Sequence, residues 1–209
     1  MVKAILAGSK TQTRRVVKDV PDWVTEIGWD CFSQTKGLDW VAGRGIYKDK
    51  GPAEKFIRCP YGQIGDRLWC KETHYRFGHW VKNGLTKTGR QKWLFKPNDK
   101  EVRYMDNPPT ENVHRIGEKN AVGWFKRSSL FMPRWASRIT LEITNIRVEL
   151  LQDITETGAI SEGCCNAYHP DFHVGEFRDL WDSINSKTYP WESNPWVWVI
   201  EFKRNELKP

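Results

Sequence analysis

Hydrophobic positions along the chain predict short elements, among which strands outnumber helices. Val2, Ile5 and Leu6 follow the i, i+3, i+4 spacing of a helix, and Gly8 comes where a left-handed helix cap would lie. We therefore expect one short helix at the amino terminus.

A polar segment follows this helix. If the segment is extended, Lys10, Gln12 and Arg14 share one face of it, and Thr11 and Thr13 share the other. The spacing predicts a polar strip with different side chains on its two faces.

Later segments predict three strands and two more helices. The strands are expected over 67–73, 138–150 and 195–203. The second strand changes phase near Thr144, which predicts a bulge, and the last is apolar on both faces early on, which predicts burial on both sides. Thr155 suits the N-cap of a helix that extends to Glu162. An amphipathic helix follows, with apolar positions Phe177, Leu180, Trp181 and Ile184.

The pattern as a whole favours a mixed α+β fold, with a small β-barrel and flanking helices, because parallel βαβ periodicity is absent. The length of 209 residues suits one elaborated domain over 1–209. Between about 75 and 130 the sequence turns polar with few periodic apolar runs, and we interpret this stretch as a long insertion.

Part of the insertion combines basic and aromatic residues. Trp93, Phe95 and Tyr104 are interleaved with seven basic residues: Lys82, Lys87, Arg90, Lys92, Lys96, Lys100 and Arg103. Basic groups can follow a phosphate chain while rings stack on bases. A solvated hairpin whose rings cover the edge of the core has the same pattern, so both interpretations stay open.

The composition narrows the class of partner. Lys and Arg total 33 against 26 Asp and Glu, a net charge of +7, which favours an anionic partner such as nucleic acid. Hydrophobic residues make up 39% of the chain and there are 12 tryptophans, which excludes a disordered basic tail. We find no apolar run long enough for a membrane span and no secretory signal. Five scattered or adjacent cysteines favour a reducing, cytoplasmic compartment.

A zinc site is the first reading of Cys164, Cys165, His169 and His173, because thiolate and imidazole are preferred zinc ligands. Adjacent cysteines seldom ligate one ion, Pro170 interrupts any helix between the histidines, and the chain has no CxxC. We therefore expect no metal and a buried pair of thiols, Cys164 and Cys165. No P-loop, GxGxxG or G-x-S-x-G motif occurs either.

Four separated segments occur in the order found in a known family. Residues 4–14 (AILAGSKTQTR) resemble the opening motif of the ASCH domain family, and 65–69 (GDRLW) with Glu72 resemble its GD-x-L-W strand. Residues 154–163 resemble its helix, and 198–202 (WVIEF) resemble its closing strand. The similarity is greatest to the longer members carried by bacteriophages and prophages. It implies a PUA-like β-barrel whose cleft binds RNA or a modified base.

The resemblance also implies candidate catalytic residues. A small bacterial member is an amidohydrolase of N4-acetylcytidine, and its lysine, threonine and glutamate fall on Lys10, Thr13 and Glu162 by motif position. Lys10 would take the proton of Thr13, the Thr13 oxygen would attack the acetyl carbonyl, and Glu162 would protonate the leaving amine, without a cofactor. Ser9 stands where relatives commonly carry arginine. Spacing alone favours a different interpretation, in which Lys10, Arg14 and Arg15 position phosphate or are solvated, and Glu162 lies on the surface of its helix.

Other residues are candidates for nucleic-acid contacts. Trp69 and Trp135 suit either base stacking or core packing, and the arginines near Trp135 suit either phosphate binding or a solvated strand edge. The full candidate set is Arg14, Arg15, Trp69, Glu72, Lys92, Trp93, Arg134, Trp135 and Arg138.

Our leading hypothesis is an ASCH-domain protein that binds RNA or a modified nucleobase and hydrolyses the amide of an N4-acylated cytidine. Three alternatives stay open: a nucleic-acid-binding module without catalysis, a metal-dependent ribonuclease, and a phage adaptor that binds a host protein through the insertion. The expected partners are RNA, DNA or a modified nucleoside, and not a membrane.

Overall fold

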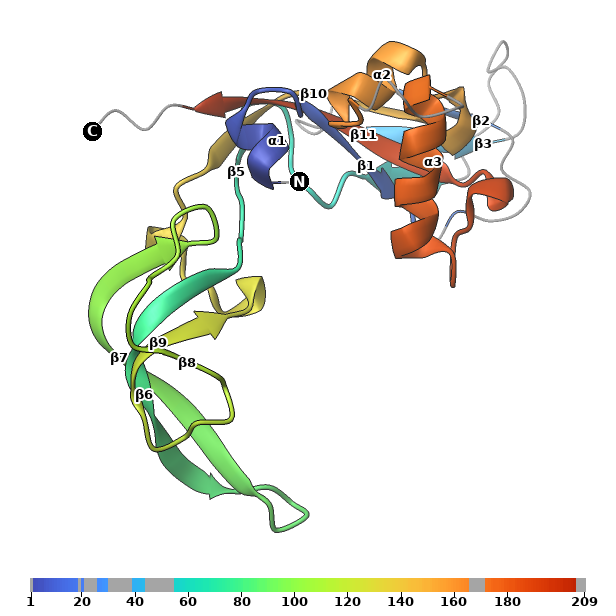
Figure 1. Ribbon diagram of the computed structural model, residues 1–209. Coiled ribbons are helices and arrows are strands. Elements are labelled where there is room, and N and C mark those ends of the chain that lie inside the picture. The colour runs from blue at the N-terminus through green and yellow to red at the C-terminus, as the bar shows by residue number, and fades with distance from the viewer. Residues whose placement is uncertain are drawn as a thin grey trace. The chain divides into compact units, whose positions relative to one another are not determined.

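The computed structural model describes residues 2–18, 20, 26–29, 39–43, 55–165 and 172–205 and has a mixed α+β fold (Figure 1). The chain divides into two compact units. Unit 1 combines Met1–Leu68 with Ile139–Pro209, and unit 2 is Trp69–Arg138. Residues 75–130, which the sequence marks as an insertion, lie within unit 2.

A four-stranded sheet organises unit 1. In spatial order its strands are β1 (Gln12–Val16), β11 (Trp196–Asn205), β10 (Thr140–Leu150) and β5 (Arg67–Trp69). β11 pairs antiparallel with both β1 and β10. The register of β10 shifts between Ile143 and Asn145, which confirms the bulge predicted near Thr144. The strand predicted over 67–73 is present but shorter than expected, since β5 includes only Arg67–Trp69.

A second, three-stranded sheet also belongs to unit 1. Its antiparallel strands are β2 (Glu26–Trp29), β3 (Asp39–Gly43) and β4 (Lys55–Arg58), in chain order.

The two faces of the four-stranded sheet pack against different partners, because side chains alternate along β11. On one face, Trp198 and Ile200 form a cluster with Val17, Ile143 and Ile146. On the other face, Val197 and Val199 pack against Leu151, Ile154, Ala159, Cys164, Phe177 and Trp181. All four of these β11 side chains are at most 1% exposed. The predicted burial of this strand on both sides is thus confirmed.

Among the residues of unit 1 that the structure describes, the α-helices are α1 (Val2–Leu6), α2 (Glu156–Ser161) and α3 (Phe172–Asn185). The Thr155 hydroxyl accepts a hydrogen bond from the Gly158 N–H and caps α2, as predicted, and Glu162 is the C-cap. The same part of the unit contains the short 3-10 helices η3 (Leu151–Asp153) and η4 (Trp191–Ser193). Within the described part of the chain, no helix combines the length and the apolar run needed to cross a membrane.

The buried face of α3 is narrower than its periodicity predicts. Phe177 and Trp181, one turn apart, are buried, but Leu180 is 43% and Ile184 is 63% exposed. A surface helix buries only the stripe that meets the sheet, and these two aromatic rings already fill that stripe. The predicted amphipathic helix is confirmed, but only two of its four apolar positions, Phe177 and Trp181, are buried.

Unit 2 is built on a curled four-stranded sheet (Figure 1). In spatial order its strands are β7 (Gln91–Tyr104), β6 (His74–Leu85), β9 (Val122–Arg127) and β8 (Val113–His114). β6 and β7 form a long antiparallel hairpin, β6 is also antiparallel to β9, and β8 runs parallel to β9. The 3-10 helices η1 (Ser129–Phe131) and η2 (Arg134–Ala136) follow β9. The polar insertion is therefore a structured sheet.

Two facing glycines make room for the aromatic core of unit 2. Gly78 in β6 is the register partner of Gly123 in β9. A Cβ on Gly78 would lie 2.7 Å from the Phe95 ring, and a Cβ on Gly123 would lie 2.5 Å from the His114 ring. Because neither glycine has a side chain, these rings lie directly on the strands and contact Phe125, which is fully buried.

Candidate functional site

Lys10 and Glu162 are far apart in the sequence but are in contact on the helix-facing side of the unit 1 sheet. The Lys10 Nζ donates hydrogen bonds to Glu162 Oε2 and to the Glu162 carbonyl oxygen, each at 2.6 Å. The two residues are only 5% and 6% exposed. They meet because Glu162 ends α2 and pairs with Lys10 through an isolated β-bridge. Two of the three catalytic candidates therefore lie together.

Further charged side chains extend this pair into a network. Arg14 Nη1 lies 3.3 Å from Glu162 Oε1, and Arg14 Nε donates to Glu149 Oε1 at 3.1 Å. Arg147 in turn contacts Glu149 and Glu201. Buried charge is tolerated when each group has a partner of opposite sign, and here the Lys10 and arginine cations meet carboxylates. Arg14 is held in the interior by these contacts.

Thr13 lies on the opposite face of the same sheet. Its register partner in β11 is Ile200, which belongs to the Trp198 cluster, whereas Arg14 pairs with a residue of the helix-facing cluster. Directly paired residues of antiparallel strands share a face. The structure thus brings Lys10 and Glu162 together and does not bring Thr13 to them.

Glu72 and Arg138 form a clamp between the two ends of unit 2. Arg138 Nε and Nη2 each donate to a different carboxylate oxygen of Glu72 at 2.9 Å, and Arg138 Nη1 lies 2.9 Å from Asp106 Oδ2. These partners hold the pKa of Arg138 above its ordinary value, the hydrogen bonds to Glu72 being the main cause. Both clamp residues, predicted as nucleic-acid contacts, are thus engaged with each other.

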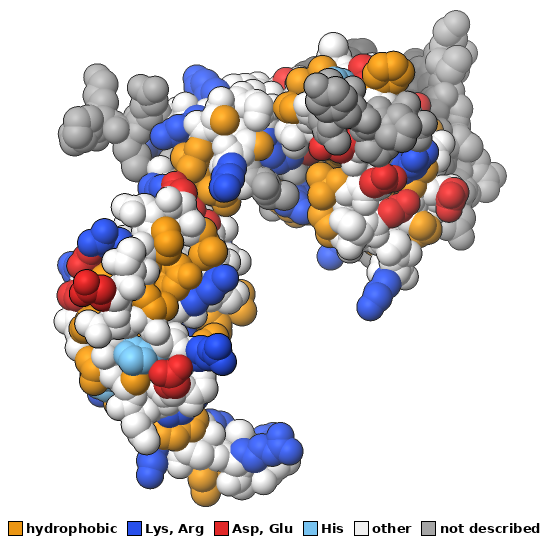
Figure 2. Space-filling view, viewed as in Figure 1, with side chains coloured by type: hydrophobic (Ala, Val, Ile, Leu, Met, Phe, Trp, Pro, Cys, Tyr) orange, Lys and Arg blue, Asp and Glu red, His pale blue; other side chains and the backbone are white. Residues whose placement is uncertain are grey.

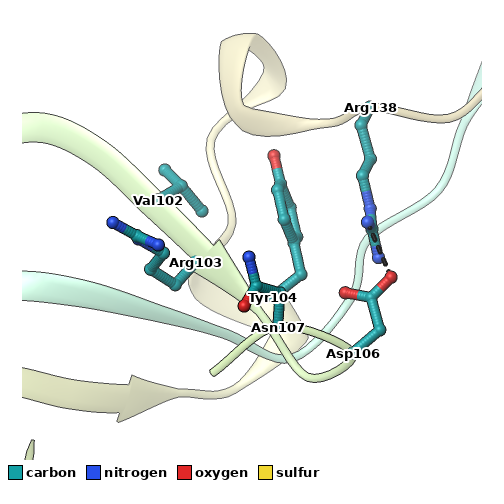
Figure 3. A pocket seen from close by; sticks show the side chains of 6 residues that line it. All are labelled: Val102, Arg103, Tyr104, Asp106, Asn107 and Arg138. Atoms are coloured by element: carbon teal, nitrogen blue, oxygen red, sulfur yellow. Dashed lines mark ion pairs between the residues drawn. The ribbon is translucent and has the colours of Figure 1, made fainter. Parts of the chain in front are cut away.

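A pocket of about 420 Å³ lies beside this clamp (Figure 3). The Arg138 guanidinium carbon lies 4.0 Å from the centroid of the Tyr104 ring, and burial raises the pKa of Tyr104. Arg103 also lines the pocket and is paired with Glu101. Because both arginines have carboxylate partners, the pocket offers a ring and amide groups to a ligand but no unpaired charge.

The two tryptophans predicted as stacking platforms both lie against cations in unit 2. Lys71 Nζ and Arg134 Cζ are 5.1 Å and 5.6 Å from the Trp69 ring centroid, and Trp69 is half-buried. Trp135 is 53% exposed, and Arg76 Cζ lies 5.0 Å from its ring centroid. Trp135 therefore has ring surface open to a base, whereas Trp69 is more enclosed.

The basic residues of the β6–β7 hairpin are at the surface. All seven predicted positions between Lys82 and Arg103 are exposed, including Lys92, and the neighbouring Trp93 is half-buried. Arg15 of unit 1 and Arg134 are exposed as well.

Positive charge is concentrated in unit 2. Trp69–Arg138 contains 15 Lys and Arg against 6 Asp and Glu, a net charge of +9, whereas the remainder of the chain carries 18 against 20, a net charge of −2. Figure 2 shows Lys and Arg side chains around an apolar area on the visible face of unit 2 and again at the end of its hairpin. The positive net charge of the whole chain therefore comes from unit 2 and not from unit 1.

Sequence reasoning missed a group of three buried or half-buried cations in this unit. Arg76 of β6, Arg127 of β9 and Lys119 lie against aromatic rings on one face of the sheet. The alternation of His74, Arg76, Gly78 and Trp80 could have indicated a strand with a cationic inner face. The sequence predicts only a polar insertion here, because the inward positions of this strand are not aliphatic.

The cysteine and histidine cluster shows no metal-binding arrangement where it is described. Cys164 is buried, and burial raises its pKa to about 11. Cys165 is exposed, so the prediction of a buried thiol pair is wrong for Cys165. His173 is the second residue of α3, and His169 lies outside the described residues. The described part of the chain contains no group of three His, Cys, Asp or Glu placed to hold a metal ion.

Comparison with known proteins adds nothing to this geometry. Neither a protein-family model, nor a curated protein, nor a solved structure matches the chain. The functional interpretation therefore rests on the residues and contacts described above.

Proposed function

We propose that this chain is a nucleic-acid-binding protein and that unit 2 is its contact surface for a single strand of RNA or DNA. The observation that supports this proposal most strongly is the net charge of +9 on Trp69–Arg138, whereas the rest of the chain is close to neutral. Neutralisation of phosphates by Lys and Arg supplies most of the non-specific affinity of such proteins.

Exposed aromatic rings favour a single strand over a duplex. Trp135 is 53% and Phe131 is 59% exposed, and both lie next to arginines of unit 2. Unstacked bases can stack on such rings, at about 1–3 kcal/mol per base, whereas bases in a duplex are already stacked. Charge and rings occur on the same unit, which is the combination that a single strand requires.

In this proposal unit 1 is the PUA-like ASCH barrel that carries unit 2. Its support is the mixed α+β fold and the order of elements, because the four family-like segments fall on α1 with β1, on β5, on α2 and on β11. Unit 1 holds the insertion between β5 and β10.

Fluorescence anisotropy tests the proposal with labelled single-stranded RNA, single-stranded DNA and duplex DNA over a salt series. We expect binding to both single strands that weakens steeply with salt, at a slope of about −0.7 per phosphate contact. The double variant Lys92→Gln, Lys96→Gln should bind more weakly and with a smaller slope than the equally charged control Lys3→Gln, Lys18→Gln. No binding at low salt, or equal loss in both double variants, would overturn the proposal.

Amide hydrolysis is a second candidate function, favoured by the contact of Lys10 with Glu162 at 2.6 Å in a buried setting. It requires a water molecule as the nucleophile in place of Thr13, because Thr13 lies on the opposite face of β1 from Lys10. Incubation with N4-acetylcytidine should release acetate and cytidine, and Glu162→Gln should abolish the release. Intact substrate alongside an active control amidohydrolase would remove this candidate and leave the binding proposal unaffected.

A further inference from the structure

Three cations on one face of the unit 2 sheet surround the Trp80 ring or its neighbours. The Arg127 guanidinium carbon lies 4.9 Å from the Trp80 ring centroid, and Lys119 Nζ lies 3.7 Å from it. Arg76 is on the same face of β6, two strand positions before Gly78. Across the described residues, neither Arg127 nor Lys119 makes a side-chain hydrogen bond or an ion pair.

Unsatisfied donors occur in the same place. Three buried side-chain atoms of the described residues have no hydrogen-bond partner, and two of them are Arg76 Nε and Trp80 Nε1. Arg76 is only 7% exposed, and its Nη2 donates to the Asp99 carbonyl oxygen at 2.6 Å. Buried polar groups nearly always have a partner. Both orphaned atoms here carry N–H donors, so the partner they lack is an acceptor.

The electrostatics agree with a missing anion. Burial lowers the pKa of Arg127 and of Lys119, and the charges of Arg76 and Arg127, respectively, lower them further. At Arg76 burial also lowers the pKa, and the charge of Asp99 acts in the opposite direction. The cations thus repel one another in the free protein, and the attraction of each cation to an anion between them would offset that repulsion.

Phosphate suits this site better than a single carboxylate, because its several oxygens can accept from more than one donor at once. Exposed rings lie at the edges of the cluster. Phe131 has the Arg127 guanidinium carbon 4.8 Å from its centroid, and Trp135 lies against Arg76. A nucleic-acid phosphate held by the cations would therefore have exposed ring surfaces nearby, on which its neighbouring bases could stack.

We propose that Arg127 and Lys119 bind one phosphate group of a single-stranded nucleic acid, with the Trp80 indole N–H as a further donor and Arg76 as a buried positive charge beneath it. The site deepens the function proposed for unit 2 and rests on it. It assigns the strongest phosphate contact to partly buried residues and not to the exposed hairpin lysines.

Binding measurements on the full chain separate this site from general charge. The probe is a fluorescein-labelled oligouridylate of about 12 nucleotides, and the variants are Lys119→Gln, Arg127→Met and the control Lys126→Gln. Lys126→Gln removes the same charge from the other face of β9, where the exposed Lys126 is the register partner of Tyr75. We expect Lys119→Gln and Arg127→Met to weaken binding about tenfold and to reduce the salt slope by about 0.7, and Lys126→Gln to weaken it less than about twofold.

The outcomes distinguish failure of the site from failure of the proposed function. A wild-type chain that does not bind the probe overturns both, whereas binding that Lys119→Gln and Lys126→Gln weaken equally overturns the site alone. If Arg127→Met unfolds the protein, Lys119→Gln still tests the site, because Lys119 lies outside the strands.

A second readout follows the Trp80 indole directly. In ¹H–¹⁵N spectra, assigned with Trp80→Phe, its Nε1–H resonance should move downfield when the oligouridylate is added. Titration with inorganic phosphate alone distinguishes the source of the anion. A shift with inorganic phosphate and none with the oligouridylate would mean a free-phosphate site and would overturn the proposal, as would an indole resonance that neither probe moves.

Discussion

The Arg138 guanidinium spans the two oxygens of the Glu72 carboxylate, and this contact joins residues near the first and last positions of unit 2. Glu72 is 5% exposed and lies before β6, whereas Arg138 follows η2. The pair therefore closes the loop that contains the whole unit.

Arg138→Met should destabilise unit 2 by about 3 kcal/mol, because it leaves the Glu72 carboxylate buried without its strongest partner. Urea unfolding followed by tryptophan fluorescence measures the loss. The double variant with Glu72→Gln should recover part of it, since no unpaired charge remains. Arg90→Met, an exposed hairpin change, is the control, and equal stability of Arg90→Met and Arg138→Met would contradict the role of the clamp.

Gly78→Ala should destabilise unit 2 by about 1–3 kcal/mol through overpacking. The added Cβ would lie 2.3 Å from the Lys96 carbonyl oxygen, which belongs to the paired strand and cannot move without breaking the β6–β7 ladder. Gly117→Ala is the matched control, because a Cβ there meets nothing within 4 Å. Thermal unfolding of the two variants should differ clearly, and coincident melting curves would show that the strands shift at no cost.

Trp135→Ala should reduce affinity for a single strand by about 1–3 kcal/mol, the contribution of one stacked base. Leu130→Ala, in the neighbouring 3-10 helix and 70% exposed, removes apolar area without removing a ring. Anisotropy titrations with the same oligonucleotide compare the two. Trp135→Phe should retain much of the affinity, and a Leu130→Ala loss as large as that of Trp135→Ala would favour general apolar contact over stacking.

The stability of unit 2 should fall on acidification because of His74. Burial lowers its pKa below 6.5, the charges of Arg76 and Arg127 lower it further, and the hydrogen bond to the Glu72 carbonyl acts in the opposite direction. The unfolded chain therefore takes up this proton first, so stability present above pH 6.5 is lost below it until the folded imidazole is protonated too. Melting temperatures between pH 8 and pH 5, on either side of the ordinary histidine pKa of about 6.5, test this. His74→Gln should flatten the curve, and an unchanged slope would assign the effect to other groups.

Alkylation should distinguish two adjacent thiols. Cys164 is 2% exposed with its pKa raised to about 11, so almost no thiolate forms near neutral pH, whereas Cys165 is exposed. Of these two thiols, brief treatment of the native chain with iodoacetamide, followed by peptide mass spectrometry, should label Cys165 and leave Cys164 unmodified. Urea-unfolded chain labels both positions as the control, and rapid native labelling of Cys164 would contradict its burial.

Local sequence patterns predict features of unit 1 correctly where a single local interaction determines the structure. Thr155 caps α2 because its hydroxyl accepts from a backbone N–H three residues later, and the apolar phase change near Thr144 marks the bulge in β10. Leu180 and Ile184 have the same helical periodicity as their buried neighbours but are exposed, since tertiary contacts decide how wide a stripe is covered.

The candidate site divides in the same way. Alternation already separates Thr13 from Lys10 and Arg14, and the register of β1 places them on opposite faces. No local pattern contains the contact of Lys10 with Glu162, which depends on a β-bridge across the chain. The sequence did not reveal the core of unit 2, because its inward positions include glycine, histidine and arginine. Histidine and arginine pack through their ring and guanidinium groups, so the strand lacks the aliphatic alternation that predicts a buried face.

The placement of unit 2 between β5 and β10 has a consequence for how such a chain can change. These strands are neighbours in the sheet, and backbone hydrogen bonds join Gly65 and Asp66 to Ile143, so the exit and re-entry points are held side by side. Unit 2 can therefore be lengthened, shortened or exchanged without a change in the strand order of the unit 1 sheet. In evolution, a protein with this arrangement can change its binding surface by replacement of unit 2 while unit 1 stays the same.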